Sequence, residues 1–380
     1  MKKLIFSATV PESIATFCKD ILENLSHRFE VVAMSSPGES LHDVDALENV
    51  RTIKVNMERR IAVFHDIVSL WKIIHVFRKE KPYIVHSITP KAGLLCMIAA
   101  WITRVPVRIH TFTGLVFPTE KGLKRRILMI TDSITCFCAT HIIPEGEGIR
   151  HDLLSYGITR KDIKVLGYGN VRGVNMDYYR RKKEVRIAAK NLIKRGYFTY
   201  LFVGRIVRDK GIDELCAAFN NLHKNYPKTR LVLVGNYEDK LDPISPETKV
   251  LIENNEAIEA VGAKFDNELL AYYTMADCFI LPSYREGFPN TVLEAGAMGL
   301  PSIVTDINGS REIIIEGENG IIIPPADADA LQHAMENLLL DDATRNYMAS
   351  NARQMIEEKF EQGFVHQCLM NFYEEIVPHQ

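Results

Sequence analysis

Two carboxylates, Glu286 and Glu294, stand eight residues apart in the stretch "SYREGFPNTVLEAGAMGLP". The apolar run before this stretch predicts a buried strand, and "TVLEAGAMG" predicts a helix that stops at a glycine. Ligands of open α/β sheets bind where the strands end, and the free amides of a helix start suit an anion such as a diphosphate. Gly287 would let the backbone approach such a ligand closely.

A structural role explains one of these carboxylates better than the other. Thr291-x-x-Glu294 has the form of a capping box, in which Glu294 folds back on the start of its own helix. Glu286 precedes the helix and has no such task. The spacing alone therefore leaves two interpretations of Glu294 open, capping and ligand binding, whereas capping does not explain Glu286.

Cations flank a second junction of the same kind. "LFVGRIVRDKG" predicts a strand that ends at Gly204-Arg205, after which Lys210 and a glycine lead into the helical "IDELCAAF". Arg offers a planar fork of donors and Lys a point charge, and both suit phosphate oxygens. A basic turn alone is weak support for a site, because many surface loops are basic, so it gains meaning beside the two glutamates.

In the first half of the chain, "VHSITPKAGLL" and "VRIHTFTGLVF" each follow a predicted strand. We expect Thr89, Lys91 and His110 to lie on the carboxyl edge of that sheet, facing a cleft. A lone histidine is more often part of the packing than of catalysis, and both interpretations of His110 stay open here.

The elements that must position these residues follow from the pattern of apolar residues. Short apolar runs alternate with helix-period segments along both halves of the chain, which indicates parallel βαβ units. The length of 380 residues suits two domains of roughly 150–200 residues each. We predict an α/β fold of two Rossmann-like doubly wound domains that face each other across a cleft, with a boundary near residues 167–196.

Composition excludes several classes of protein. A formal net charge of −2 argues against a surface built for nucleic acid. The seven cysteines stand mostly in apolar runs and indicate a reducing compartment. Neither a secretory signal nor a membrane-spanning run is evident, since "GLLCMIAAWIT" is about half the roughly 20 residues that a span needs. We expect a cytoplasmic protein.

The ordered motifs resemble the retaining GT-B glycosyltransferases of family 4 over nearly the whole chain. "HSITPKAGLLCMIAA" and "VRIHTFTG" are similar to loops of the family's first domain, and its second-domain blocks are similar to "GRIVRDKG", "PSYREGFPNTVLEAGAMGLP", "TDINGSREII" and "GENGIIIPP". The resemblance implies an acceptor-side domain over residues 1–170, joined by a C-terminal helix over 362–380, and a nucleotide-sugar domain over 171–361. It implies transfer of a sugar from a nucleotide-diphosphate donor, a UDP-N-acetylhexosamine or a UDP-hexose.

The resemblance also implies roles for the residues of the second domain. Arg205 and Lys210 would neutralise the donor diphosphate, Glu286 would contact the transferred sugar, and Glu294 would bind the ribose. The backbone at 288–290 would meet the sugar and phosphates, and residues 263–265 would hold the nucleobase. The implied catalytic residues are Glu286, Arg205 and Lys210, and the implied donor-binding set is Gly204, Arg205, Lys210, Phe265, Gly287, Phe288, Pro289, Asn290, Thr291 and Glu294.

Two departures from the family's pattern concern the first domain. Many members carry His-x-His-Thr-Pro-Lys, and this chain has Ile88 at the second histidine of that motif. Many also carry Thr-x-His-Gly, and this chain has Thr113 at the histidine before the glycine. An essential histidine at either place is thereby excluded. The Thr-Gly-Leu form resembles transferases that act on polyprenyl-diphosphate sugars in bacterial capsule, O-antigen or exopolysaccharide synthesis, which implies a lipid-linked saccharide acceptor. The acceptor-side candidates are Thr89, Lys91, His110 and Thr113.

No metal or other cofactor is expected. "DVD" at Asp43–Asp45 and "DAD" at Asp327–Asp329 have the form of metal-binding motifs, but a polar loop and a helix cap suffice to explain them. "GYGNVRG" has its glycines too widely spaced for a dinucleotide-binding turn, and no apolar helix follows it.

Three further hypotheses accompany this interpretation. A nucleotide-sugar epimerase of the same architecture would need acid–base groups, for which His110 and Glu286 are candidates. A non-catalytic sugar-nucleotide sensor would bind the donor without turnover. Separately, the basic segments 121–129 and 178–195 would contact an anionic membrane surface, although the second also suits a solvated linker helix.

Overall fold

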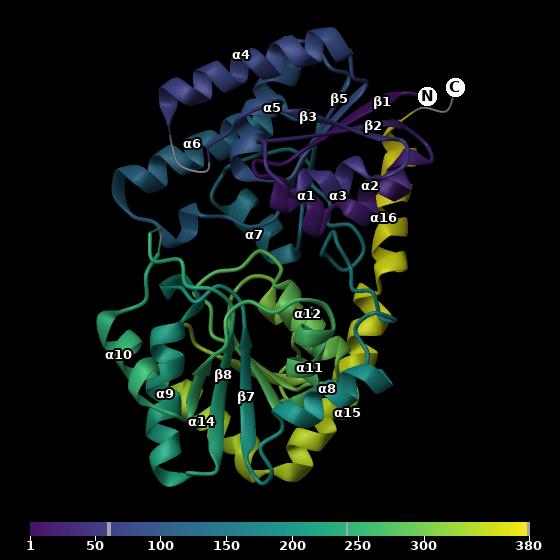
Figure 1. The fold of residues 1–380 in the computed structure, drawn as a ribbon. Helices are drawn as coiled ribbons and strands as arrows, with labels where there is room; N and C mark the ends of the chain where they lie inside the picture. The colour runs from purple at the N-terminus through teal and green to yellow at the C-terminus, as the bar shows by residue number, and fades with distance from the viewer. Residues whose placement is uncertain (59–61, 241, 378–380) are drawn as a thin grey trace. The chain divides into compact units, whose positions relative to one another are not determined.

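The computed structural model describes residues 1–58, 62–240 and 242–377 of the chain. The chain divides into two compact units (Figure 1). Unit 1 comprises Met1–Arg172 together with Phe364–Gln380, and unit 2 comprises Gly173–Gly363. Each unit contains a six-stranded sheet with helices on its faces, which confirms the predicted pair of doubly wound domains.

The sheet of unit 1 has the order β3-β2-β1-β4-β5-β6, and all its neighbouring strands pair in parallel. The order reverses between β1 and β4, and loops that leave the carboxyl ends on either side of such a point diverge and leave a crevice. The strands are β1 Lys3–Ser7, β2 Glu30–Ser35, β3 Val50–Lys54, β4 Ile84–Ser87, β5 Val107–Phe112 and β6 His141–Pro144.

Helices cover both faces of this sheet because successive strand residues point to opposite sides. Leu4 and Phe6 of β1 join a core with α1, α2, α3 and α16, whereas Ile5 joins a second core with α4, α5 and α6. The helices are α1 Pro11–Phe17, α2 Lys19–Ser26, α3 Leu41–Asp45, α4 Val63–Glu80, α5 Pro90–Ile102, α6 Gly122–Cys138, α7 Glu147–Ser155 and α16 Gln362–Ile376, with a 3₁₀ turn at Phe117–Thr119.

The C-terminal helix α16 is fixed to the sheet of unit 1 by a buried polar chain. Nδ1 of His86 lies 2.5 Å from the Tyr373 hydroxyl, and Nε2 lies 2.7 Å from the Thr111 hydroxyl. All three side chains are buried. Burial lowers the pKa of His86 to about 3, so the imidazole is neutral and each ring nitrogen has a partner.

Unit 2 repeats the topology of unit 1. Its sheet has the order β12-β11-β10-β7-β8-β9, and its neighbouring strands also pair in parallel. The reversal lies between β7 and β10, which places the carboxyl ends of these two strands side by side. The strands are β7 Phe198–Val203, β8 Thr229–Val234, β9 Ile258–Ala260, β10 Cys278–Leu281, β11 Ser302–Thr305 and β12 Gly320–Ile323.

A single large core joins the sheet of unit 2 to its helices. Gly296 lets α12 approach α15 closely, since a Cβ atom there would lie 2.6 Å from the Ile356 side chain. The helices are α8 Lys183–Leu192, α9 Ile212–Asn225, α10 Pro246–Asn254, α11 Asp266–Met275, α12 Asn290–Ala297, α13 Ser310–Ile313, α14 Ala328–Leu340 and α15 Asp342–Phe360, with a 3₁₀ turn at Arg208–Lys210. Over the described ranges, no helix combines the length and the apolar character that crossing a membrane requires.

Replacing Tyr373 by Phe should destabilise unit 1. The change leaves Nδ1 of His86 buried without a partner, which costs about 1–3 kcal/mol in free energy of unfolding. Urea unfolding followed by circular dichroism measures the change. The matched control is Tyr347→Phe, which removes an exposed hydroxyl bonded to Glu318 and should cost less than about 0.5 kcal/mol. Equal effects of the two substitutions would contradict a locking role for Tyr373.

Candidate donor site and acceptor-side residues

The carboxyl edge of the sheet in unit 2 gathers loops that lie far apart in the sequence. Arg205 follows β7 directly, and Glu286 lies in the loop after β10. Because β7 and β10 are neighbours, the two loops meet: the Tyr284 amide donates to the Asp209 carbonyl at 2.9 Å. The turn also needs a glycine, since Gly211 has φ +68° and a Cβ atom there would lie 2.1 Å from the Pro282 carbonyl oxygen.

Lys210 and Glu286, two of the residues predicted to be catalytic, contact each other. The Lys210 ammonium forms an ion pair with Oε1 of Glu286, and the Ser283 hydroxyl donates to the same oxygen at 2.7 Å. Both charged side chains are largely buried, with 19% and 13% exposed. The structure therefore joins the "GRIVRDKG" and "SYREGFPN" motifs through one charged contact.

Arg205, the third of these residues, has a different partner. Its guanidinium pairs with the carboxylate of Glu238 in the loop that follows β8. The Arg205 side chain is 51% exposed, so solvent reaches about half of it. A cation that is half exposed at a sheet edge is well placed to exchange its carboxylate partner for phosphate oxygens.

Further contacts hold the loops after β7, β8 and β10 together. The Asp209 amide donates to Oδ2 of Asp242 at 2.8 Å, and the Asp209 carboxylate pairs with Arg285 at 2.5 Å. The Tyr284 hydroxyl donates to Glu214 at 2.6 Å, and burial, followed by this bond, raises the pKa of Tyr284. These contacts position the backbone that carries Arg205 and Lys210.

The capping box at Thr291-x-x-Glu294 is not formed. Helix α12 begins at Asn290 with Pro289 as its N-cap, so Thr291 is already the second helical residue and Glu294 the fifth. A side chain at the fifth position cannot reach the free amides of its own helix start. The Glu294 carboxylate is instead 6% exposed and accepts a hydrogen bond from the Tyr273 hydroxyl at 3.0 Å.

The other donor-site candidates divide into exposed and buried residues. Phe265 is 73% exposed at the N-cap of α11, beyond the carboxyl end of β9, where its ring is open to a planar ligand. Phe288 is buried and its ring centroid lies 5.4 Å from that of Phe360, so only its backbone is available. The remaining candidates lie at the two strand–helix junctions: Gly204 after β7, and Gly287, Pro289, Asn290 and Thr291 around the start of α12.

In unit 1, three acceptor-side candidates lie just beyond the neighbouring strands β4 and β5. The Thr89 hydroxyl accepts from the Thr9 amide at 2.8 Å, and the Thr113 hydroxyl donates to the Ile88 carbonyl at 3.1 Å. Lys91 pairs with Asp66 of α4 at 2.5 Å. The threonines are thus engaged in fixing the loops, and Lys91 has a carboxylate partner.

The prediction that His110 faces a cleft is wrong. Its side chain is 1% exposed inside the unit, where Nδ1 lies 2.9 Å from the Ser87 hydroxyl and the ring packs edge-on against Phe112. Gly93 makes room for the ring, since a Cβ atom there would lie 2.3 Å from Cε1 of His110. Burial lowers the pKa of His110 to about 3. The packing interpretation therefore describes His110.

The two aspartate motifs have local structural roles. Asp327 caps α14 by accepting from the Ala330 amide at 2.8 Å, as predicted. Asp43 lies within the short helix α3 and not in the expected polar loop. In the part of the chain that the structure describes, no three His, Cys, Asp or Glu side chains cluster in a way that could hold a metal ion.

Sequence reasoning missed Glu238, Asp66 and Tyr273. Glu238 follows β8 in "VGNYEDK", so strand order would have brought it near Arg205, but strand order is not readable from spacing. Tyr273 reaches Glu294 from α11, and Asp66 reaches Lys91 from α4. No local motif marks either residue.

Matches to two family models, together with the two doubly wound units, show that the chain is a glycosyltransferase that uses a nucleotide sugar. Residues 14–169 match the family described as "Glycosyl transferase 4-like domain", and residues 184–355 match "Glycosyl transferases group 1". The chain belongs to glycosyltransferase family 4, and the epimerase hypothesis is not supported.

Relatives of the chain support this assignment. It is 32% identical over 373 residues to the capsular polysaccharide biosynthesis glycosyltransferase CapM of Staphylococcus aureus, covering 98% of this chain and 97% of CapM. It is 27% identical over 311 residues to an Escherichia coli UDP-Gal:α-D-GlcNAc-diphosphoundecaprenol α-1,3-galactosyltransferase, covering 80% and 78%. The fold matches that of Anabaena HepE in complex with UDP-glucose, with a TM-score of 0.83 and 15% identity over 99% of this chain and 100% of HepE.

Replacing Glu238 by Gln should strengthen binding of a nucleoside diphosphate. The change removes the carboxylate that competes with the ligand for Arg205. Because the ligand no longer has to break an exposed ion pair, its Kd should fall by about two- to fivefold. Isothermal titration calorimetry measures it. Asp239→Asn is the control, because Asp239 is the next residue but pairs with Lys249 and not with Arg205. Weaker binding by Glu238→Gln would show that Glu238 orients Arg205 for the ligand.

The two buried histidines should make unit 1 lose stability in mild acid. Burial lowers the pKa of His86 and His110 from 6.5 to about 3, so the unfolded chain binds protons below pH 6.5 that the folded chain does not. Stability is therefore complete above pH 6.5 and falls between 6.5 and 3, by at most about 1.4 kcal/mol per pH unit for each histidine. Urea unfolding across this range measures the slope. His110→Asn should reduce the slope, whereas the exposed His65→Asn should not.

Proposed function

We propose that this chain transfers a sugar, with retention of anomeric configuration and without a metal ion, from a UDP-hexose or UDP-N-acetylhexosamine to a saccharide on a polyprenyl diphosphate. The reaction would be a step in the assembly of a bacterial capsule, O-antigen or exopolysaccharide. The observation that carries the proposal is the contact of Lys210 with Glu286 where the loops that follow the neighbouring strands β7 and β10 meet, with Arg205 directly after β7.

These residues suit the departure of a nucleoside diphosphate. As the bond between the anomeric carbon and the diphosphate oxygen breaks, negative charge grows on the phosphate oxygens. Arg205, Lys210 and the first amides of α12 supply positive charge and donors in positions set by the sheet. Glu286, held by Ser283, would accept hydrogen bonds from hydroxyls of the transferred sugar. Glu294 would serve the ribose and Phe265 the base.

The relatives support the proposed substrates. The E. coli relative is named for a UDP-Gal donor and a diphosphoundecaprenol-linked acceptor, CapM for capsular polysaccharide synthesis, and HepE was solved with UDP-glucose. The sequence match to CapM spans almost the whole of both chains, so it includes the acceptor-side unit as well as the donor-side unit. A diphosphate-linked acceptor of this kind would be embedded in a membrane, so we also propose that the chain contacts a membrane surface.

Replacing Arg205 by Ala should lower kcat by about a hundredfold, because one preorganised donor to developing charge contributes about 3 kcal/mol. The assay measures nucleoside diphosphate release from a panel of UDP-sugars with a polyprenyl-diphosphate-linked disaccharide. Arg208→Ala is the matched control, since Arg208 lies exposed in the same turn but outside the proposed site. Glu294→Gln should raise the KM for the donor.

Several outcomes would overturn parts of this proposal. Full activity in both Arg205→Ala and Glu294→Gln would remove these residues from the site. A product of inverted configuration, determined by NMR, would exclude the retaining mechanism. Loss of activity on treatment with EDTA, restored by a divalent cation, would exclude the metal-free reaction. Release that does not depend on the lipid-linked acceptor would exclude that acceptor class.

A further inference from the structure

Three helices on one face of unit 1 present much apolar surface outward. α4 packs on α5, and α5 packs on α6, with their inner sides in the core. Of the large apolar side chains that are exposed in the described part of the chain, nearly half lie on α4, α6 and the end of α5. Exposed apolar residues are usually scattered singly, so such a concentration indicates a surface that meets a partner.

On α6 the exposed apolar residues form one continuous stripe. Leu123, Ile127, Ile130, Ile134 and Phe137 follow one another at alternating spacings of four and three, which places them in a line along the helix. The ends of the stripe are the most exposed, at 73% for Leu123 and 69% for Phe137. At 1.5 Å per residue the stripe is about 21 Å long.

A second stripe runs along α4, and both tryptophans of the chain belong to this surface. Phe64, Ile67, Val68 and Trp71 are exposed at helical spacing, with Phe64 at 86% and Trp71 at 66%. Trp101, at the end of α5, is 51% exposed. The centroid of the Trp101 ring lies 6.2 Å from that of Phe137, the last residue of the α6 stripe. The α6 stripe, the α4 stripe and Trp101 together form the apolar face of unit 1.

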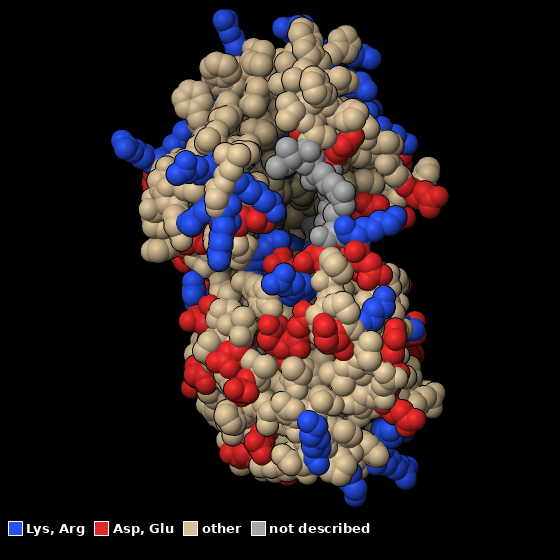
Figure 2. Space-filling model, turned by 90° about the vertical axis from the view of Figure 1, so that its left-hand side faces the viewer, with Lys and Arg blue, Asp and Glu red and all other residues tan. Residues whose placement is uncertain are grey.

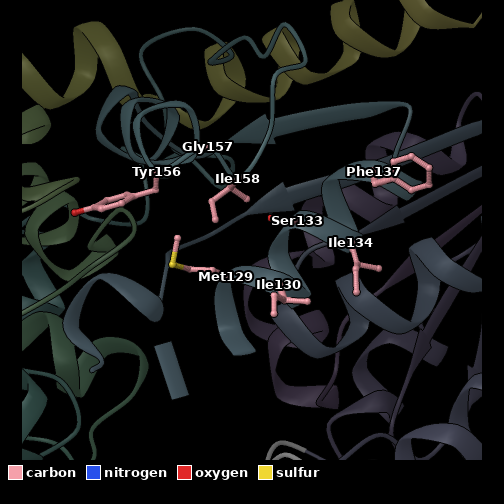
Figure 3. Close-up of a pocket in the computed structure, with 8 residues that line it drawn as sticks. All are labelled: Met129, Ile130, Ser133, Ile134, Phe137, Tyr156, Gly157 and Ile158. Carbon is pink, nitrogen blue, oxygen red and sulfur yellow. The ribbon is translucent and has the colours of Figure 1, made fainter. Parts of the chain in front are cut away.

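A shallow groove of about 330 Å³ adjoins the α6 stripe (Figure 3). Met129, Ile130 and Ile134 line it from α6, and Tyr156 and Ile158 line it from the segment after α7. Its walls are mainly hydrocarbon, so the groove suits an aliphatic chain better than a polar ligand.

Basic side chains accompany the apolar face. Four cations, Lys121, Lys124, Arg125 and Arg126, stand at the start of α6, and Lys72, Arg78 and Lys79 lie on α4. In Figure 2 the surface of unit 1 turned to the viewer shows broad tan areas with blue Lys and Arg side chains beside them. Cations next to exposed hydrocarbon are typical of helices that lie in the interface of an anionic bilayer.

The acidic side chains of α4 and α6 are paired with other cations or buried, and of the cations just named Lys124 pairs with Glu120, which precedes α6. Asp66 pairs with Lys91, and Glu80 pairs with Lys3 and Arg51. Asp132, the acid of α6, is largely buried, and this burial raises its pKa to about 7. The face therefore combines hydrocarbon with cations, which is the complement of a bilayer surface that carries anionic headgroups.

We infer that the apolar face of α4, α5 and α6 docks on an anionic lipid bilayer, with its tryptophans and aliphatic side chains inserted at the headgroup level. The choice of a bilayer as the occupant rests on the lipid-linked acceptor of the proposed function and on the charge complementarity. The sequence singles out two basic segments, and the docking surface inferred here contains one of them, 121–129, as the segment that contacts the bilayer. The segment 178–195 uses one side of α8 to pack on α11 and exposes only two large apolar residues, Ile187 and Ile193.

The two tryptophans make the inference directly measurable. The full-length protein is mixed with vesicles of phosphatidylcholine alone or with added phosphatidylglycerol, and without any acceptor. We expect a blue shift of tryptophan fluorescence, quenching by brominated lipid, and co-sedimentation that weakens as salt rises. Ile127→Ser/Ile130→Ser/Ile134→Ser should reduce vesicle affinity at least tenfold, because exposed side chains are lost that the fold does not need.

Matched variants test whether this surface, and not another part of the chain, binds the vesicles. Ile187→Ser/Ile193→Ser removes exposed isoleucine side chains of a similar degree of exposure from unit 2 and should leave vesicle binding unchanged. Lys121→Gln/Lys124→Gln/Arg126→Gln should weaken it by about fivefold per charge removed, whereas Lys190→Gln/Lys194→Gln/Arg195→Gln should not. Arg205→Ala should bind vesicles normally even if it is inactive, so failure of the proposed reaction and failure of docking are distinguishable.

Two outcomes would overturn the inference. The first is unshifted fluorescence with anionic vesicles at low salt. The second combines three results: the protein is a dimer in sedimentation velocity without lipid, the triple Ser variant is a monomer, and the protein does not bind vesicles. These results together would make the apolar face a contact between copies of the chain.

Discussion

The parallel pairing of β7 with β10 is the constraint on which the proposed donor site depends. The two strands are almost 80 residues apart in sequence, yet Tyr200 lies opposite Cys278 and Leu201 opposite Phe279. Parallel strands end at the same edge of their sheet, so this register brings the Arg205–Lys210 turn against the Ser283–Glu286 loop. The Gly211 turn then fits against the Pro282 carbonyl with no room for a side chain. A shift of this register would move Arg205 and Lys210 away from Glu286.

Electrostatic pairing in the site follows from that geometry. Cations placed where a diphosphate would bind repel each other and the positive end of a helix, so a stable unliganded fold needs carboxylates nearby. Glu286 and Glu238 supply them, one for Lys210 and one for Arg205. The two pairs differ in burial: Lys210 is mostly covered, whereas Arg205 is half exposed. Exchange of a partner costs less at the exposed pair, so Arg205 is the cation at which an arriving anion would first compete.

Sequence reasoning predicted the fold and the family from features that are local and ordered. Strand–helix alternation gave two doubly wound units, and the order of "GRIVRDKG" and "SYREGFPNTVLEAGAMGLP" pointed to the family. What it could not predict are contacts that depend on strand order or on a helix start. Glu238 meets Arg205 because β8 lies beside β7, and the capping box fails because α12 starts at Asn290, which makes Glu294 its fifth residue and brings it to Tyr273. The position of His110 was also not predictable from spacing, because its burial in the unit decides whether the imidazole can contact a ligand.

The two units share a topology but differ in where their apolar side chains lie. In unit 2 the helices bury their apolar sides in one core, and the charged residues gather at the strand ends. In unit 1, α4 and α6 are apolar on their outer as well as their inner sides, which a helix that only covers a sheet does not require. Such outward stripes lower solubility and contribute nothing to the core, so stability does not account for them. The proposed lipid-linked acceptor would account for them, because an enzyme that binds the membrane in which its acceptor is confined searches for that acceptor in two dimensions in place of three. The apolar face thus adds a structural reason for a membrane-bound acceptor, and it does so through residues that lie outside the proposed donor site.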